Sequence, residues 1–187
     1  MHVVIPKPLR TFGRHASCPP QRQPIPARCW GASDELSGAK MILLTRAVVQ
    51  PWNCDMMGHM TTRFYVAFFD DAINILLGQA TGWAPTTPEW ADRGWADVRH
   101  EIDFVGEVAS GVILGIYGAV RNVGRTSIQT DYEMRRLHGG ELAAKLAAKT
   151  VFFNLAERKS TPLTEPMLER LKSSMNATAA PSHGGPA

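Results

Sequence analysis

The sequence lacks the uninterrupted apolar run of roughly 18 residues that a membrane-spanning helix needs. It also has few cysteines: Cys18, Cys29 and Cys54 form no CxxC pair and leave an odd count. This pattern gives neither a disulfide framework nor a metal-type cluster, and it is typical of a reduced compartment. We therefore expect a cytoplasmic chain with no membrane segment, no metal and no cofactor.

Charges of the two signs nearly balance outside the first residues. The formal net charge is +3, and residues 1–40 alone carry six Lys or Arg against two Asp or Glu. The remaining residues are therefore close to neutral. Binding of a nucleic acid usually requires a basic patch on the folded domain. The sequence shows no such cluster of Lys and Arg, so we expect no nucleic-acid partner.

Both ends of the chain have a composition typical of disorder. Residues 1–40 hold six of the thirteen prolines and show no apolar periodicity. They lack the apolar core of a secretory signal, and their prolines argue against the amphipathic helix of a transit peptide. We favour a third interpretation, that translation begins at Met41. Residues 173–187 are rich in Ala, Ser, Gly and Pro and are predicted to be a disordered tail, which leaves one folded domain over residues 41–172.

Within this domain the pattern is one strand, one long helix and then strands. Apolar side chains recur at helical spacing from about His59 to Ala80. Residues 111–120 are almost wholly apolar, as in a central strand covered on both faces. Other predicted elements are a strand at 41–50, a loop at 82–94, an alternating strand at 95–104 with Val98, His100, Ile102 and Phe104 on one face, a hairpin strand at 128–134 and a short helix at 164–172.

The segment from Glu141 to Leu155 contains conflicting signals. Its sequence ELAAKLAAK consists of strong helix formers. The following Thr150-Val151-Phe152-Phe153 is rich in β formers, and Lys145, Ala147 and Lys149 can share one strand face. We predict a strand, because tertiary context often overrides propensity and a neighbouring sheet would supply its partner.

The richest motif lies at the entrance to the long helix, in the run Asn53-Cys54-Asp55-Met56-Met57-Gly58-His59-Met60-Thr61-Thr62. Asp55 precedes a glycine-led turn that opens the helix. A helix start carries unpaired N–H groups and partial positive charge, so it attracts a carboxylate and a developing oxyanion alike. A carboxylate beside such donors is suited to acyl-transfer chemistry.

This motif and the order of elements resemble the hotdog-fold acyl-CoA thioesterases of the 4-hydroxybenzoyl-CoA thioesterase type. The resemblance covers about residues 42–171. It is carried by Asp55, by Gly58-His59-Met60, by Tyr65, by the run Phe68-Phe69-Asp70-Asp71-Ala72, by Glu107-Val108 with Gly111, and by Arg158 with Pro162-Leu163.

The resemblance implies an α+β hotdog fold, in which an antiparallel sheet of about five strands wraps one long central helix and a short C-terminal helix follows. It implies hydrolysis of an acyl-CoA thioester at a subunit interface, in a homodimer or homotetramer. Asp55 would be the catalytic general base or nucleophile, and the backbone N–H of Thr62 would polarise the carbonyl, beside Gly58 and His59. The substrate-binding candidates are Met60, Thr61, Tyr65 and Phe68, with Arg121 and Arg125 as partners of the coenzyme A phosphates.

Two departures from the family pattern bear on specificity. Thr61-Thr62 replaces the Asn-Asn of many relatives, so hydrogen bonding at the helix entrance differs. Asn53 stands where Asp is often seen, which leaves Asp55 as the one carboxylate of the loop.

Plainer interpretations exist for each candidate. Asp55 could serve as a helix-end charge worth roughly 0.3–1 kcal/mol, and His59 could serve to cap the helix entrance. Tyr65, Phe68 and His100 fit core positions. Arg121, Arg125 and the nearby Arg135 and Arg136 fit solvated strand ends, Asp70 and Asp71 fit a polar helix face, and Trp83, Trp90 and Trp95 fit loop packing.

Two other functions fit the same pattern. One is a hotdog hydratase or dehydratase acting on acyl thioesters, although His59 lies four residues after Asp55 in a D-x-x-G-H arrangement that favours a thioesterase. The other is an acyl-thioester-binding protein without catalysis, for which the altered Thr61-Thr62 leaves room.

Overall fold

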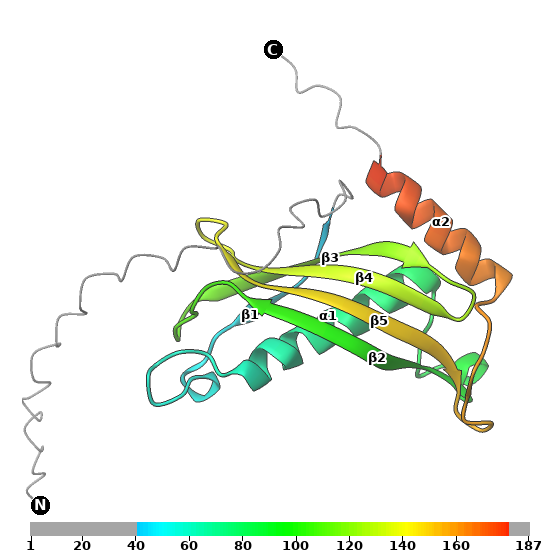
Figure 1. Ribbon diagram of the computed structural model, residues 1–187, viewed down its shortest axis with the longest axis horizontal. Coiled ribbons are helices and arrows are strands. Elements are labelled where there is room, and N and C mark those ends of the chain that lie inside the picture. The colour runs from blue at the N-terminus through cyan, green and yellow to red at the C-terminus, as the bar shows by residue number, and fades with distance from the viewer. Residues whose placement is uncertain (1–40, 180–187) are drawn as a thin grey trace, which may run out of the picture. The chain divides into compact units, whose positions relative to one another are not determined.

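The computed structural model describes residues 41–179 of the chain. The interpretations of residues 1–40 and of the last part of the tail, residues 180–187, lie outside the described residues. Figure 1 shows the arrangement of the elements. In chain order they are β1 (Ile42–Val48), the 3-10 turn η1 (Pro51–Asn53), α1 (Thr62–Thr81), the 3-10 turn η2 (Pro88–Trp90), β2 (Arg93–Phe104), β3 (Ile113–Val123), β4 (Ser127–Arg136), β5 (Leu142–Asn154), β6 (Lys159–Ser160) and α2 (Glu165–Ala179).

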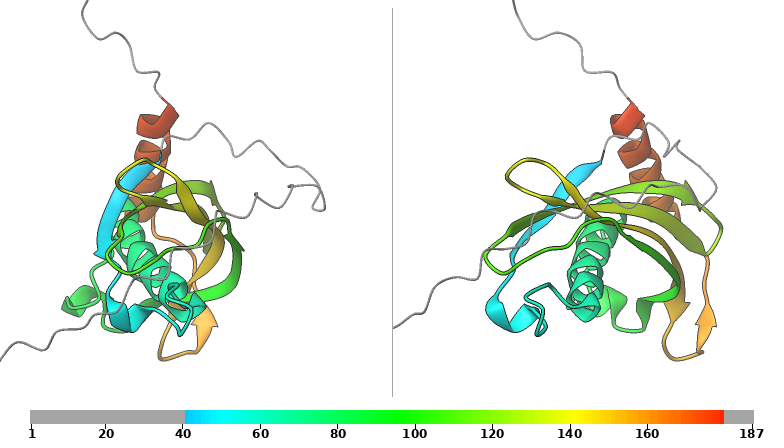
Figure 2. Two further views of the ribbon diagram at one scale, coloured as in Figure 1. Left: turned by 90° about the vertical axis from the view of Figure 1, so that its left-hand side faces the viewer. Right: turned by 60° about the vertical axis from the view of Figure 1, so that its left-hand side comes forward.

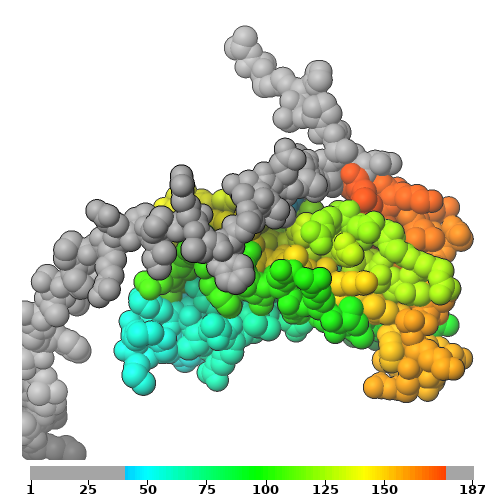
Figure 3. All heavy atoms as spheres, in the orientation of Figure 1, coloured from blue at the N-terminus to red at the C-terminus, as the bar shows by residue number. Residues whose placement is uncertain are grey.

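The strands form one antiparallel sheet in the order β1-β3-β4-β5-β2, and the short β6 pairs with β5. The sheet curls around α1, which lies against its concave face (Figure 2). This confirms the predicted α+β architecture of an antiparallel sheet wrapped around one long helix. Within the described residues β1 and β2 each have a single neighbouring strand, and β2 lies at the surface of the face shown in Figure 3.

The core lies between α1 and the concave face of the sheet. Phe69, Ile73 and Leu77 on α1 are at most 2% exposed, and their spacing is the predicted apolar stripe. Across from them, Ile116 on β3 and Met134 on β4 have no exposed surface. The helix packs against β1, β3 and α2.

The two strand predictions that rested on context are confirmed. β3 is buried over most of its length between β1 and β4, as its apolar sequence predicts. β5 is a strand along residues 142–154 despite its helix-forming composition, because it pairs with β4 on one side and β2 on the other. Ladder hydrogen bonds on both sides outweigh the intrinsic preference of alanine and lysine.

Several boundaries differ from those predicted. α1 begins at Thr62 rather than near His59, because residues 55–59 close a hydrogen-bonded loop of their own. β2 begins at Arg93, inside the predicted loop, since Arg93 and Gly94 pair with the end of β5. The expected face pattern of β2 is confirmed for His100, Ile102 and Phe104, which share one face, and is wrong for Val98. A register shift between Asp97 and Arg99 takes Val98 out of the ladder, so Asp97 shares a face with His100.

The C-terminal helix is longer than predicted. α2 continues to Ala179 instead of ending near Lys172, so the prediction of disorder was wrong for residues 173–179. Met167 and Leu171 anchor α2 by burying their side chains against the body, and no Gly or Pro interrupts the sequence between Met167 and Ala180. The short β6, which the sequence did not reveal, follows the turn after β5.

None of the helices within residues 41–179 is both long and apolar enough to span a bilayer.

Candidate active site

The loop from Asp55 to His59 is built around the Asp55 carboxylate. Asp55 Oδ1 accepts hydrogen bonds from the backbone N–H of Met57 at 2.8 Å and of His59 at 3.2 Å. The Asp55 N–H donates to the His59 carbonyl at 2.9 Å, which closes the loop. Gly58 takes a positive φ of 83° at the turn, a conformation that glycine adopts without strain. The carboxylate is therefore exposed but held in place through one oxygen.

The loop is also fastened to the segment that joins β2 and β3. The Met60 N–H donates to the Val108 carbonyl at 2.7 Å, and His59 forms a bridge with Ala109. The His59 imidazole Nε2 lies 3.3 Å from a carboxylate oxygen of Glu107. Met60 itself is buried in the core. The His59 backbone thus serves Asp55, while the His59 ring is directed toward Glu107.

The helix begins immediately after this anchored loop. Thr61 is the N-cap of α1, yet within the described part of the chain its side chain makes no capping hydrogen bond. Its hydroxyl oxygen is buried and unpartnered among residues 41–179. An uncapped start leaves the first N–H groups of the helix, including that of Thr62, without an intrahelical acceptor. The helix entrance thus keeps its capacity to bind an anionic oxygen.

Tyr65 closes the inner side of this region. Its hydroxyl donates to the Gly106 carbonyl at 3.2 Å, and its ring packs edge-on against Phe104 with the centroids 5.1 Å apart. Burial raises the pKa of Tyr65, and the positive charge of Arg136 opposes that shift. Tyr65 is therefore a neutral, anchored side chain that joins α1 to the end of β2.

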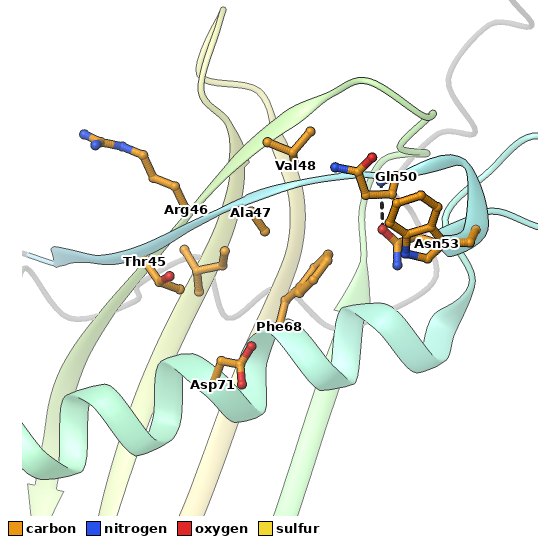
Figure 4. A pocket seen from close by; sticks show the side chains of 10 residues that line it. Thr45, Arg46, Ala47, Val48, Gln50, Asn53, Phe68 and Asp71 are labelled. Atoms are coloured by element: carbon orange, nitrogen blue, oxygen red, sulfur yellow. Dashed lines mark hydrogen bonds between the residues drawn. The ribbon is translucent and has the colours of Figure 1, made fainter.

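Phe68 lies on the other flank of α1, toward β1. It lines a pocket of ≈ 330 Å³ together with Asp71, and Figure 4 shows both side chains pointing from α1 toward β1. Gln50 and Asn53 close one end of the pocket, where the Gln50 N–H donates to the Asn53 side-chain oxygen at 2.7 Å. Asp55 lines neither this pocket nor the ≈ 410 Å³ pocket at the far end of α1. Phe68 and Asp55 therefore do not line a common pocket among those described.

The two arginines expected to hold phosphates lie at the end of the sheet far from Asp55. Arg121 is near the end of β3 that is remote from the loop, eight strand residues or about 26 Å beyond Ile113. It faces Asp131, with a closest nitrogen–oxygen distance of 3.6 Å. Arg125 follows in the β3–β4 turn, where its carbonyl accepts the Leu163 N–H at 2.9 Å.

Arg136 is the basic side chain that the fold brings to the loop. Its Nη2 donates to the Glu107 carbonyl at 2.6 Å, and its charge acts on Tyr65. In the sequence, Arg136 is one of four arginines near the predicted hairpin, and no local pattern separates it from the others. The β3–β4 register, which pairs Arg136 with Leu114, is what carries it to the loop end of the sheet.

Within residues 41–179, no three His, Cys, Asp or Glu side chains are arranged so that they could hold a metal ion. Cys54, the one cysteine in that range, is free. The loop therefore offers a fixed carboxylate, a helix entrance with unused donors, a neutral tyrosine and a nearby guanidinium. Such a set can bind and polarise a carbonyl and supply a base or nucleophile.

Comparison with known proteins bears on the family and the fold. The family model of the thioesterase-like superfamily matches residues 49–171. No curated protein matches the chain in sequence. Three solved structures illustrate the similarity of fold. A hypothetical protein from Staphylococcus aureus, crystallised in complex with CoA, has a TM-score of 0.68 at 15% identity, covering 79% of this chain and 91% of its own.

The other two structures carry enzyme names. A 1,4-dihydroxy-2-naphthoyl-CoA thioesterase from Synechocystis has a TM-score of 0.61 at 18% identity, covering 70% of this chain and 95% of its own. A hexameric broad-specificity acyl-coenzyme A thioesterase, crystallised as a mutant, has a TM-score of 0.60 at 17% identity. The match covers 75% of this chain and 99% of that thioesterase. At these identities the similarity establishes the fold.

Proposed function

The chain belongs to the thioesterase-like superfamily and is a thioester hydrolase, and on that premise we propose that it hydrolyses an acyl-CoA thioester to a free acid and coenzyme A. One observation carries the proposal: the Asp55 carboxylate is fixed in a loop that leads straight into the uncapped start of α1. A base or nucleophile and an oxyanion site are thereby supplied by adjacent residues.

In the proposed reaction the thioester carbonyl oxygen binds at the start of α1, where the Thr62 N–H and the helix dipole stabilise its growing negative charge. Asp55 Oδ1 is occupied by the two loop N–H groups, so Oδ2 is the oxygen left to react. Acting as a base, it takes a proton from the water that attacks the carbonyl carbon. The carbon–sulfur bond then breaks, and the coenzyme A thiolate leaves and takes up a proton.

A nucleophilic route uses the same geometry. Asp55 Oδ2 attacks the carbonyl carbon, the thiolate leaves, and water hydrolyses the resulting mixed anhydride. In either route Gly58 and His59 serve by shaping the loop: Gly58 makes the turn, and His59 supplies an N–H to Asp55 while its ring faces Glu107.

We further propose that the site is completed in a homodimer or homotetramer. Among the described strands, β2 is an edge with one neighbour, and its Val98 is 56% exposed. An exposed edge of this length is a template for pairing with a second copy. Antiparallel pairing of two β2 strands would bring the remote end of one protomer, which carries Arg121 and Arg125, toward the Asp55 end of the other. Arg136 would hold a coenzyme A phosphate from within the same protomer.

A thiol-release assay on a panel of acyl-CoA esters tests this function. We expect release of free thiol with at least one ester, and any loss of the conjugated absorbance of an enoyl-CoA to be matched by an equal release of thiol. Loss of enoyl absorbance without thiol release would instead identify a hydratase. Calorimetric binding of acyl-CoA esters with no thiol release across short, branched, aromatic and long acyl chains would identify a binding protein. The odd number and the spacing of the cysteines in the sequence support a cytoplasmic location.

A further inference from the structure

The pocket of ≈ 330 Å³ between α1 and β1 takes no part in the thioester chemistry proposed above, because Asp55 does not line it. Its volume is near the lower end of the range for ligand pockets, about 300–1,000 Å³. The dimer proposed through β2 leaves this pocket open, since β1 forms the opposite edge of the sheet. The pocket can therefore hold a small molecule of its own.

The walls of the pocket are largely apolar because of the way β1 and α1 face each other. Thr45 pairs with Ile116, and Ala47 pairs with Leu114. Ile116 and Leu114 point into the core, so the side chains of Thr45 and Ala47 also lie on the α1 side of the sheet. Phe68 faces them from α1 (Figure 4). The body of an occupant would thus rest on hydrocarbon surface.

Trp52 adds a second aromatic ring at the rim of the pocket. It lines the pocket and is 70% exposed, although burial of so large an aromatic side chain is strongly stabilising. The face of an indole attracts a cation more strongly than that of a tyrosine or phenylalanine ring. The exposed ring can therefore cover an apolar ligand, and it favours positive charge.

The carboxylate of Asp71 gives the pocket an uncompensated negative charge. It points from α1 toward β1, and among residues 41–179 it forms no hydrogen bond and no ion pair. Arg46 also lines the pocket. It lies between Thr45 and Ala47 on the strand, however, so its side chain takes the convex face, and Figure 4 shows it directed away from Asp71.

These features together select an organic cation. Asp71 would repel an anion, and a neutral chain laid over its carboxylate would remove water from a charge without returning a hydrogen bond. A metal ion would need further ligands, and the described part of the chain has no group of three His, Cys, Asp or Glu side chains that could supply them. An ammonium group donates up to three hydrogen bonds, and its bonds to a carboxylate are among the strong ones.

We propose that this pocket binds a small aliphatic amine, with its ammonium group at Asp71 and its hydrocarbon chain along Phe68 toward Trp52. Phe68 precedes Asp71 by three residues, about 4.5 Å along α1, so the carbons next to the ammonium group meet the phenyl ring. Gln50 and Asn53 close the far end of the pocket, which limits the length of the chain. The inference does not depend on the proposed thioester hydrolysis.

Titration calorimetry of the full chain with three six-carbon probes, n-hexylamine, 1-hexanol and hexanoate, tests the proposal. The titrations are made at pH 7 in 0.15 M salt, which screens unspecific attraction between charges. We expect one site, at which hexylamine binds about tenfold or more tighter than 1-hexanol and hexanoate binds more weakly than the alcohol.

A fourth probe separates a free amine from a lysine side chain of a partner protein. Nα-acetyl-lysine methylamide carries the same ammonium group on a peptide unit. It should bind more weakly than hexylamine, because the closed end of the pocket has no room for the peptide unit. Tighter binding of the lysine probe would assign the pocket to a protein partner and would overturn the proposal.

Asp71→Asn should bring the ratio of the hexylamine and hexanol affinities down toward one, because it removes the charge and keeps the shape of the side chain. Asp70→Asn is the matched control. It removes the same charge from the neighbouring residue, which does not line the pocket, and should keep the ratio. Excess coenzyme A should leave the affinity for hexylamine unchanged.

Equal affinities for hexylamine and hexanol in the unaltered protein would overturn the inference. A ratio that survives Asp71→Asn, or that falls equally in Asp70→Asn, would do the same. Displacement of hexylamine by coenzyme A would place the amine at the Asp55 loop and would also overturn it. Thiol release is measured separately: its absence with every acyl-CoA ester would contradict the proposed hydrolysis and leave the amine site supported.

Discussion

Asp55 and His59 are joined by two hydrogen bonds that run in opposite directions. The Asp55 N–H donates to the His59 carbonyl at 2.9 Å, and the His59 N–H donates to Asp55 Oδ1 at 3.2 Å. The carboxylate is thus a structural part of its own loop as well as the candidate reactive group. Its position is set before a substrate arrives, which is what electrostatic preorganisation requires.

Edge pairing through β2 predicts that a single charge will separate the subunits. We expect Val98→Glu to give a folded monomer with little thioesterase activity, because a carboxylate on an exposed edge strand opposes strand addition. Val98 is 56% exposed, and Val48 on the opposite edge strand β1 is 49% exposed, so Val48→Glu is the matched control. Sedimentation velocity and circular dichroism check the result. Dissociation by the Val48 change alone would place the pairing edge on β1.

Arg136 is expected to bind the phosphates of the substrate. Arg136→Gln should raise KM for acyl-CoA with little change in kcat, since it removes a cation used for binding and not for chemistry. The same variant should hydrolyse acyl-pantetheine, which lacks the nucleotide phosphates, with an unaltered KM. If kcat/KM falls by the same factor for acyl-CoA and for acyl-pantetheine, Arg136 acts through its hydrogen bond to Glu107. Arg121→Gln and Arg125→Gln, measured alongside, test the arginines that the sequence favoured.

At Gly118 two core side chains, those of Leu44 and Tyr132, pack directly against the backbone of β3. A Cβ at this position would lie 2.7 Å from Leu44 Cδ1 and 2.7 Å from Tyr132 Cδ1. Gly118→Ala should therefore lower the free energy of unfolding by about 1–3 kcal/mol. Gly94→Ala, also within a strand, would meet Leu155 at an ordinary 3.6 Å and should change it by less than about 0.5 kcal/mol. Urea denaturation of both variants decides; equal stabilities would refute the packing argument.

Asp131 carries a buried carboxylate on the convex face of the sheet. Burial raises its pKa above the ordinary value of 3.8, and Arg121 opposes the shift. A group whose pKa is raised on folding contributes stability below its unfolded pKa and loses that contribution as pH rises through its folded pKa. Asp131→Asn should therefore be more stable than the original protein at neutral pH. The advantage should shrink as pH falls through the raised pKa of the folded state and should be lost below the ordinary value; an advantage that grows in acid would show the sign to be wrong.

The elements that the sequence revealed are those with a strong local signal. The apolar stripe of α1 and the wholly apolar β3 could be predicted because burial on a helix face or on both faces of a strand leaves a clear period. The β5 strand was predicted against its alanine- and lysine-rich composition, on the grounds that a neighbouring sheet supplied partners. The extension of α2 was missed because alanine and serine can belong to a tail as well as to a helix.

In the candidate site, the residues that the sequence predicted belong to one local motif, and those it missed depend on strand register. Asp55, Gly58, His59 and Thr62 lie within one short motif, so local sequence brought them together. Arg136 depends on the register of β4 against β3, which no local pattern encodes. Away from the site, the Asp97–His100 pair depends on a register shift in β2. Simple alternation put Val98 on the face of His100, and His100 itself was interpreted as fitting a core position.

The most direct test of the account is the turnover of Asp55→Asn. Asparagine keeps an oxygen that can accept the Met57 and His59 N–H groups, so the loop, the stability and the affinity for acyl-CoA should be nearly unchanged. It offers no base or nucleophile, so kcat should fall by about 10²–10⁴-fold. Asp70→Asn, an exposed carboxylate change on α1, is the control and should retain full turnover. Full activity in Asp55→Asn would contradict the central claim.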